Sequence, residues 1–217
     1  MKYDYLAIEK KWQDKWDEAG VFRSLDEKEA GGKPKFYALV EFPYPSGAGM
    51  HVGHIKAYSG LEVVSRMRRM QGYNVLFPMG FDAFGLPTEN YAIKTGMHPR
   101  AVTDKNIAKF TQQLKRVGYS FDWSRVIDTT DEDYYRWTQW IFLKMFEAGL
   151  AFRDTALVNY CPTCKVVLSN EDSQGGKCDI CHSDVVQKSK DVWYLRITKY
   201  ADRLLEGLNE VDYLPNI

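Results

Sequence analysis

The sequence lacks the features that place a chain in a membrane, in a fibre or in a disordered class. None of its apolar runs approaches the ~18 residues that a membrane span needs, and it does not begin with the apolar segment of a secretory signal. Apolar residues make up 45% and charged residues 27%, as in ordinary globular proteins. We therefore expect a soluble, cytoplasmic protein of one large domain, or of one domain and a small module.

Excess charge of either sign is also absent, because 29 Lys and Arg residues balance 29 Asp and Glu residues. A nucleic-acid partner would therefore depend on a local basic face rather than on the field of the whole protein. The spacing of the candidate basic residues fits solvated helix faces equally well. These candidates are Arg66, Arg68, Arg69, Arg100, Lys105, Lys109, Lys115 and Arg116.

Cysteine is scarce, and its distribution is more informative than its number. Two C-x2-C pairs thirteen residues apart bring four thiolates within reach of one Zn²⁺, and closed four-cysteine sites are structural rather than catalytic. His182 is an alternative ligand to the cysteine that precedes it. Two disulfides are the other alternative, which the absence of a secretion signal disfavours. The predicted zinc ligands are Cys161, Cys164, Cys178 and Cys181.

Hydrophobic periodicity predicts the main elements. Strand-like runs, a loop segment and helices alternate along the chain, and the order strand, irregular loop, helix, strand indicates a right-handed βαβ unit of a doubly wound sheet. About three strands are recognisable, too few for a complete doubly wound domain. The expected helices cover residues 3–19, 53–70, 103–117, 131–148 and 199–209, the strands cover 36–42, 74–79 and 192–197, and residues 24–34 form a loop.

Two Gly- and Pro-rich segments, 43–54 and 80–88, follow the first two strands. Ligands of doubly wound sheets bind beyond the carboxyl ends of the strands, which is where both segments are expected. His51 and His54 stand at the start of the helix that follows the first segment, where free N–H groups and the helix dipole favour anions. Gly53 between them leaves room for a flat ring such as adenine. A histidine pair at this spacing is also common as a plain surface feature.

These segments resemble class I aminoacyl-tRNA synthetases. Residues 42–54 are similar to the HIGH-type signature of that family, and residues 80–87 (GFDAFGLP) to its second substrate loop. Isoleucyl and valyl members typically have His before Gly-Leu-Pro, whereas Asp-Ala-Phe-Gly-Leu-Pro is similar to the leucyl members. The likeness spans the whole chain and continues in residues 134–145, 158–162 and 193–201.

The resemblance implies an α/β fold, namely a partial doubly wound, Rossmann-like catalytic domain with an inserted zinc-ribbon module. Residues 1–155 would form the amino-terminal half of the nucleotide-binding domain, 156–187 the zinc module, and 188–217 the return to the catalytic domain. A KMSKS loop, an editing insertion and an anticodon-binding bundle are not found in the sequence, and residues 188–190 (KSK) lie in the wrong place for the first. The chain would then be an amino-terminal fragment whose partners include the missing carboxy-terminal half.

The activity implied by the resemblance is that of a leucine–tRNA ligase, with leucine, Mg²⁺-bound ATP and tRNA(Leu) as its partners and with little activity in the isolated chain. His51 and His54 would be catalytic by holding ATP phosphates. Asp82 would pair with the leucine ammonium, although a turn-capping role is an alternative. The implied ATP-binding residues are Pro43, Tyr44, Pro45, Ser46, Gly47, His51, Val52, Gly53 and His54, and the implied leucine-binding residues are Phe42, Tyr44 and Asp82.

Three alternatives remain at this point. Phe42 and Tyr44 are equally well explained by core packing. Glu41 stands where many relatives have an apolar residue, and its carboxylate would be costly to bury without a partner. A second alternative is that the protein is an isoleucyl or valyl synthetase. A third is that it is a non-catalytic RNA-binding module with a zinc ribbon.

Overall fold

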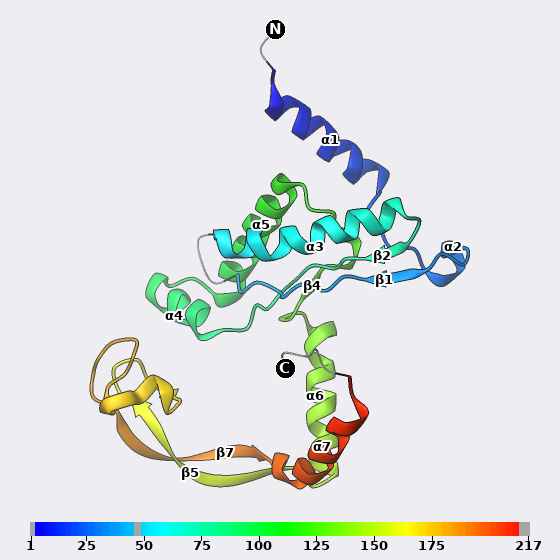
Figure 1. The fold of residues 1–217 in the computed structure, drawn as a ribbon. Coiled ribbons are helices and arrows are strands. Elements are labelled where there is room, and N and C mark those ends of the chain that lie inside the picture. Colours follow the sequence, from blue (N-terminus) through cyan, green and yellow to red (C-terminus); the bar gives the residue numbers. More distant parts are fainter. Residues whose placement is uncertain (1–2, 46–48, 213–217) are drawn as a thin grey trace. The chain divides into compact units, whose positions relative to one another are not determined.

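The computed structural model describes residues 3–45 and 49–212 (Figure 1). The chain divides into two compact units, Met1–Arg136 and Trp137–Ile217. We describe each unit by itself.

The first unit contains the βαβ arrangement that the sequence predicts. Strands β1 (Lys35–Tyr37) and β2 (Asn74–Leu76) pair in parallel, and helix α3 (Val52–Met70) connects them. A second parallel pair joins β3 (Gly80–Phe81) to β4 (Ile127–Asp128). The other helices of this unit are α1 (Tyr5–Ala19), α2 (Glu27–Ala30), α4 (Leu86–Thr95), α5 (Pro99–Val117) and the 3₁₀ turn η1 (Trp123–Arg125).

The strands are shorter than the apolar runs from which they were predicted. In the first run β1 ends at Tyr37, one residue before the Ala38 N–H that still donates to the Leu76 carbonyl, and the second run divides into β2 and β3. Pro78 stands in the gap of the second run, where it has no N–H group to donate to a neighbouring strand. Residues 86–95 form α4, which is not among the expected helices and begins inside the Gly- and Pro-rich segment 80–88. Pro is well tolerated in the first turn of a helix.

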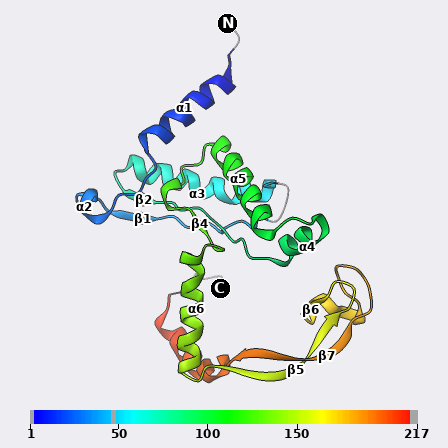
Figure 2. The same cartoon turned by 180° about the vertical axis from the view of Figure 1, so that it is seen from behind.

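The core of the first unit lies between these strands and one layer of helices. Ala38 and Val40 are buried while Tyr37 and Leu39 are about 60% exposed, so only one face of this segment is covered. Helices α3 and α5 lie on the covered side (Figure 2). The buried cluster consists of Ala38, Val40, Tyr58, Val75, Phe77, Met79, Phe81, Phe110, Leu114, Tyr119 and Phe121.

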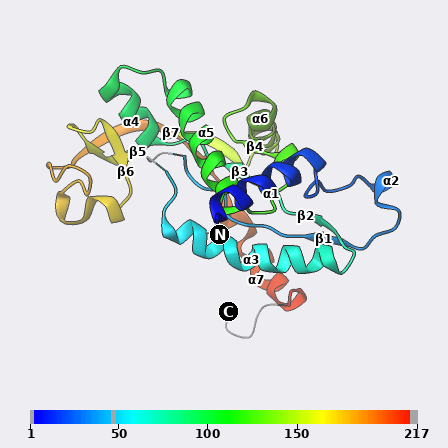
Figure 3. The ribbon, with the colours of Figure 1, turned by 90° about the horizontal axis from the view of Figure 1, so that it is seen from above.

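Helix α1 packs beside α5 (Figure 3), where the Gln13 side chain donates to the Arg116 carbonyl at 2.9 Å. The turn after α1 is held by the guanidinium of Arg66, which lies 5.0 Å from the Trp16 ring and 5.1 Å from the Phe22 ring. The Arg69 guanidinium donates hydrogen bonds to the hydroxyl and the carbonyl of Ser120. Several basic residues that were candidates for RNA contacts thus have partners within the fold, among them Arg66, Arg68, Arg69, Arg100 and Lys115.

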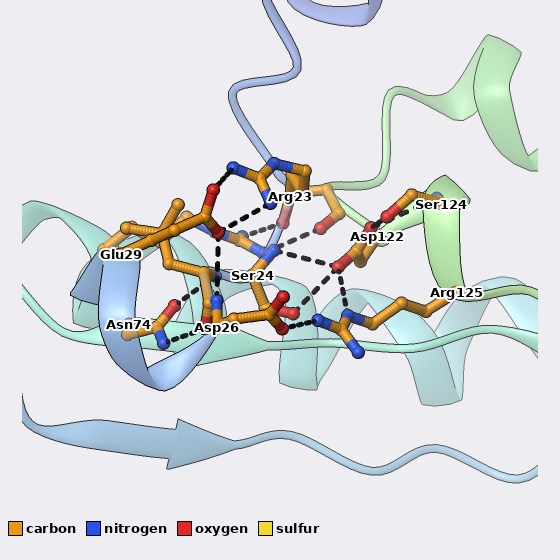
Figure 4. Close-up of polar contacts among 11 residues, drawn as sticks. Arg23, Ser24, Asp26, Glu29, Asn74, Asp122, Ser124 and Arg125 are labelled. Atoms are coloured by element: carbon orange, nitrogen blue, oxygen red, sulfur yellow. Dashed lines mark hydrogen bonds and ion pairs between the residues drawn. The ribbon is translucent and has the colours of Figure 1, made fainter.

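A buried carboxylate joins the segment after α1 to the segment after α5 (Figure 4). Asp122 is 1% exposed and accepts hydrogen bonds from the backbone N–H and hydroxyl of Ser24, at 2.8 and 2.9 Å, and of Ser124, at 3.1 and 2.6 Å. Burial raises the pKa of Asp122, but the hydrogen bonds from Ser124 and Ser24 outweigh burial and bring the pKa below its usual 3.8. The charged form is therefore the one that stabilises this junction.

The second unit is built on a long antiparallel hairpin. Strands β5 (Ala151–Cys161) and β7 (Val186–Leu195) pair along their length, and β6 (Val166–Leu168) adds to the far end of β5. Only the end of β7 was predicted, in the run 192–197. The predicted helix 199–209 consists of η3 (Ile197–Tyr200), α7 (Ala201–Gly207) and η4 (Leu208–Glu210).

Helix α6 (Glu132–Glu147) contains the boundary between the units, close to the predicted helix over 131–148. Its Phe142 ring packs edge-on against Trp193 of β7 at 5.0 Å between centroids. Among the described residues no helix is long and apolar enough to cross a membrane.

Replacing Asp122 with Ala is expected to lower the free energy of unfolding by about 3 kcal/mol, because buried serine donors lose a charged acceptor. Since the folded pKa lies below the unfolded one, the contribution of Asp122 is complete above about pH 4 and is lost as the pH falls through the folded value. Urea unfolding at pH 7 measures the loss. The control is Asp14→Ala, which removes an exposed pair with Lys10 and should cost less than about 1 kcal/mol; equal losses in both variants would contradict the prediction.

Candidate active site and metal centre

The two histidines form a closed arrangement at the first turn of α3. His51 is the N-cap residue, and its Nδ1 accepts a hydrogen bond from the Gly53 backbone at 3.1 Å. The His51 backbone N–H donates to Nδ1 of His54 at 3.3 Å. The two rings stack with centroids 3.8 Å apart. The pair is thus fixed by the cap of the helix and not only by its spacing.

These bonds determine where the protons of the neutral rings lie. Both Nδ1 atoms act as acceptors, so the neutral imidazoles of His51 and His54 carry their protons on Nε2. Each ring therefore has an Nε2–H group to offer at a helix N-terminus. Hydrogen-bond donors at that position suit phosphate oxygens.

The pKa of His54 is lowered from its usual 6.5. Burial is the largest cause, repulsion from a protonated His51 is the next, and the carboxylate of Glu41 partly opposes both. His54 is therefore neutral near pH 7, in the state in which its Nδ1 accepts and its Nε2 donates.

Gly53 has a local reason to be glycine. A Cβ atom at this position would lie 2.9 Å from ring atoms of His51, so any side chain would displace the ring that caps the helix. The sequence analysis assigns this space to a flat ring such as adenine. In the structure the His51 ring lies against Gly53, and the adenine contact stays a prediction.

Hydrogen bonds and ring packing bring the second Gly- and Pro-rich segment against the first. The Asp82 backbone N–H donates to the Pro43 carbonyl at 3.1 Å. The ring of Phe42 lies over Gly80, where a Cβ atom would clash with the ring. Phe42 and Asp82 are half-buried, whereas Tyr44 is 59% exposed. The exposure of Tyr44 does not fit core packing for that ring, while the partial burial of Phe42 fits either interpretation.

Helix α5 holds the first segment on both sides of residues 46–48. Asn106 donates to the Pro45 carbonyl at 2.7 Å, and the Gln113 side chain accepts from the Met50 backbone at 2.9 Å. Ser46 and Gly47, two of the predicted ATP-binding residues, lie outside the described residues. Val52, another of the predicted ATP-binding residues, is 82% exposed.

Glu41 does not point unpaired into the core. The residue is exposed, and its backbone carbonyl accepts a hydrogen bond from the Tyr58 hydroxyl at 3.0 Å. Burial, followed by the charge of Glu41, raises the pKa of Tyr58 to about 12, so the hydroxyl stays protonated and remains a donor.

Sequence reasoning missed the residues that support Asp82 from the other side. Thr129 bonds to the residues on either side of Asp82, and Arg100 of α5 bonds to the turn that follows Thr129. These contacts join positions that are far apart in the chain, and no spacing within the sequence indicates them.

The predicted zinc ligands come together beyond the end of the β5–β7 hairpin. Two of them, Cys161 and Cys178, are buried. Their Sγ atoms and those of the other two lie within 4.8 Å of one another, and the group that this geometry brings together does not include His182. The four cysteines of this group are Cys161, Cys164, Cys178 and Cys181.

The two C-x2-C pairs have the same backbone conformation. The Lys165 N–H donates to the Cys161 carbonyl at 2.8 Å, and the His182 N–H donates to the Cys178 carbonyl at 2.8 Å. Lys165 and His182, which follow the two pairs, have φ values of 59° and 60°. Ser183 donates hydrogen bonds that lower the pKa of the Cys181 thiol and so favour the thiolate. Two matched turns and close sulfur atoms form a donor set suited to a soft cation.

The His54 pKa gives a direct check on this geometry. A titration of the ring resonances by NMR is expected to place it below 6.5. In His51→Asn the pKa should rise and yet stay below 6.5, because the repulsion from His51 is gone while burial remains. A His54 pKa above 6.5 in the unsubstituted chain would contradict the arrangement. Because the folded pKa is the lower one, the contribution of His54 to stability is complete above about pH 6.5 and is lost as the pH falls through the folded value.

Comparison with known proteins identifies the family and the fold of the chain. Residues 11–217 match the family of tRNA synthetases class I (I, L, M and V). A leucine–tRNA ligase of Alkaliphilus oremlandii (strain OhILAs) is 56% identical over 216 residues, which are 100% of this chain and 27% of the relative. The chain therefore spans about a quarter of the length of that relative.

Two solved structures have the same fold. An Agrobacterium radiobacter LeuRS, in a ternary complex with tRNA and LeuAMS, matches with a TM-score of 0.84 and 35% identity over 99% of this chain and 27% of its own. A Mycobacterium tuberculosis methionyl-tRNA synthetase in complex with methionyl-adenylate matches with a TM-score of 0.65 and 24% identity. This match covers 82% of this chain and 35% of the synthetase chain. Because the family match covers nearly the whole chain and the chain shares the fold of a solved LeuRS, it belongs to the class I tRNA synthetase family.

Proposed function

We propose that the chain carries the leucine-activating site of a leucine–tRNA ligase. In the first step a carboxylate oxygen of leucine attacks the α-phosphorus of Mg²⁺-bound ATP, and pyrophosphate leaves. In the second step a ribose hydroxyl at the 3′ end of tRNA(Leu) attacks the leucyl carbonyl, and AMP leaves. The observation that carries the proposal is the hydrogen bond from the Asp82 backbone N–H to the Pro43 carbonyl, which holds Asp82 against the segment that leads to the two histidines.

Each residue of the site has a role that needs no protein nucleophile. The Nε2–H groups of His51 and His54 donate to phosphate oxygens at the N-terminus of α3, where they stabilise the charge that develops on the transferring phosphorus. Asp82 accepts from the leucine ammonium, and Phe42 and Tyr44 line the amino-acid site. ATP contacts extend over residues 43–47 and 51–54. Rate acceleration then comes from positioning and electrostatic stabilisation.

Leucine is the favoured amino acid among the candidates. Ala83 and Phe84 follow Asp82 where isoleucyl and valyl enzymes typically have a His before Gly-Leu-Pro, and the relative at 56% identity is a leucine–tRNA ligase. The intact set of His51, His54 and Asp82 argues against a non-catalytic RNA-binding module. An isoleucyl or valyl enzyme is the second candidate.

Binding of non-hydrolysable aminoacyl-adenylate analogues to the 217-residue chain tests the function. Calorimetry should show tighter binding of the leucyl analogue than of the isoleucyl, valyl and methionyl analogues. Asp82→Asn should weaken the leucyl analogue about tenfold to a hundredfold, the loss of one charged hydrogen bond, and Asp14→Asn on α1 should leave it unchanged. Preference for another analogue would overturn the assignment to leucine, and binding of tRNA without any analogue would support the non-catalytic module.

We further propose that the four cysteines hold one structural Zn²⁺. A tetrahedral site with Zn–S bonds of about 2.3 Å requires Sγ atoms about 3.8 Å apart. The Sγ atoms of Cys161 and Cys181 are 3.4 Å apart, and all four lie within 4.8 Å of one another. The ion would fix the end of the hairpin, where the apolar contacts of Val166 and Leu168 with the cysteines form a small core. In this interpretation residues 156–187 are a zinc module between residues 1–155 and 188–217 of the catalytic domain.

Zinc analysis of the purified chain is expected to give one ion per molecule. Cys178→Ser should lower this content several-fold, because a three-ligand site binds more weakly, and His182→Ala should not change it. Chelation should also reduce the thermal stability of the second unit, since binding to the folded form stabilises it. Retention of one zinc by Cys178→Ser together with loss in His182→Ala would contradict this ligand set.

We propose that the remaining partners are tRNA(Leu) and the carboxy-terminal remainder of the same enzyme, since the chain spans 27% of its curated relative. Leucine-dependent pyrophosphate exchange should be low in the chain alone and should rise when the carboxy-terminal part is added. A cytoplasmic location fits four cysteines that form no disulfide.

A further inference from the structure

One residue bonds to the chain on both sides of Asp82. The Thr129 backbone N–H donates to the Phe81 carbonyl at 3.2 Å, and the Ala83 backbone N–H donates to the Thr129 hydroxyl oxygen at 2.9 Å. The Asp82 N–H donates to Pro43 at 3.1 Å. Three hydrogen bonds therefore fix the backbone from Phe81 to Ala83, and the carboxyl group of Asp82 moves only by rotation of its own side chain.

Thr129 is itself held in place by the turn that follows β4. The backbone N–H and hydroxyl of Thr130 donate to Asp128 at 2.8 and 2.7 Å. Arg100, in the first turn of α5, lies 3.5 Å from Asp128, 3.2 Å from Asp131 and 3.1 Å from the Thr130 hydroxyl. The acceptor oxygen of Thr129 therefore belongs to a braced turn and not to a free loop.

The hydroxyl oxygen has a role that a side chain of the same shape does not replace. Valine matches threonine in volume but lacks an acceptor, so the Ala83 N–H would lose its partner beside the proposed leucine site. Serine retains the oxygen. The pair of substitutions therefore separates the hydrogen bond from the packing of the side chain.

We propose that Thr129 is a positioning residue for amino-acid recognition, which acts through Asp82 by fixing the direction of its carboxylate toward the substrate ammonium. The inference rests on the proposed function and assigns to that site a residue that touches no substrate. Its consequence is specific: loss of the Thr129 hydroxyl should weaken recognition of the ammonium group and leave the adenosine and side-chain contacts unchanged.

The test uses two ligands that differ only at the ammonium. The first is the sulfamoyl analogue of leucyl-adenylate, and the second is its 4-methylpentanoyl counterpart, which has the same side chain and adenosine but no amino group. In Thr129→Val the affinity for the leucyl analogue should fall about tenfold while that for the des-amino analogue stays within twofold, as a displaced charged contact predicts. Thr129→Ser should restore the difference between the two ligands.

Thr95→Val is the matched control, because that hydroxyl bonds to the Tyr91 carbonyl within α4; it should change neither affinity. Equal weakening of both ligands in Thr129→Val, or no weakening of either, would overturn the role of Thr129. If the Val variant does not fold, Thr129→Ala supplies the same comparison without a branched side chain.

The behaviour of the unsubstituted chain separates this inference from the proposed function. If it binds both analogues equally, or neither, the role of Asp82 in leucine recognition fails before Thr129 is considered. If it prefers the leucyl analogue and Thr129→Val retains that preference, the inference fails alone.

Discussion

The hydrogen bond from the Asp82 backbone to the Pro43 carbonyl is the contact on which the arrangement of the candidate site depends. It joins the chain beyond β1 to the residue that follows β3, at two positions that lie outside the helices and strands. The contact is kept in place from below, because Phe77, Met79 and Phe81 are fully buried in the core of the first unit. From the side, Phe42 packs over Gly80 so closely that a Cβ atom there would force the ring to move. Burial of an apolar strand thus fixes the position of a polar group at its end.

His54 is suited to hydrogen bonding rather than to carrying a charge. Burial and repulsion from His51 keep His54 neutral near pH 7, and the capping bonds occupy both Nδ1 atoms as acceptors. A neutral donor at a helix N-terminus binds a phosphate oxygen without the strong attraction of a full positive charge. Such a site favours a transferring phosphoryl group held by geometry, in agreement with a reaction that needs no nucleophile from the protein.

The elements that local patterns specify were predicted well. The βαβ unit, the histidines at the start of α3 and the gathering of the four cysteines follow from periodicity, from Gly and Pro positions and from C-x2-C spacing. Strand lengths were wrong where Pro78 interrupts a run that hydropathy alone treats as continuous. Helix α4 was missed because the Gly and Pro residues that begin it are also typical of turns.

Contacts between polar residues far apart in the chain were not predictable in the same way. Asp122 binds Ser24, and Thr129 binds Ala83, yet a single Asp or Thr in a polar stretch has no periodicity to mark it. The arginines of α3 could not be assigned from the sequence for a related reason, because a basic residue has the same appearance in a sequence whether it contacts RNA or an aromatic ring. Arg66 lies on Trp16 and Phe22. Long-range polar contacts therefore had to come from the fold.

A crystal structure of the chain with the sulfamoyl analogue of leucyl-adenylate tests the central claim most directly. The account predicts the leucine ammonium within about 2.7–2.9 Å of an Asp82 carboxylate oxygen, with the sulfamoyl group facing Nε2 of His51 or His54. An analogue bound with its ammonium turned away from Asp82, or bound elsewhere on the first unit, would contradict it.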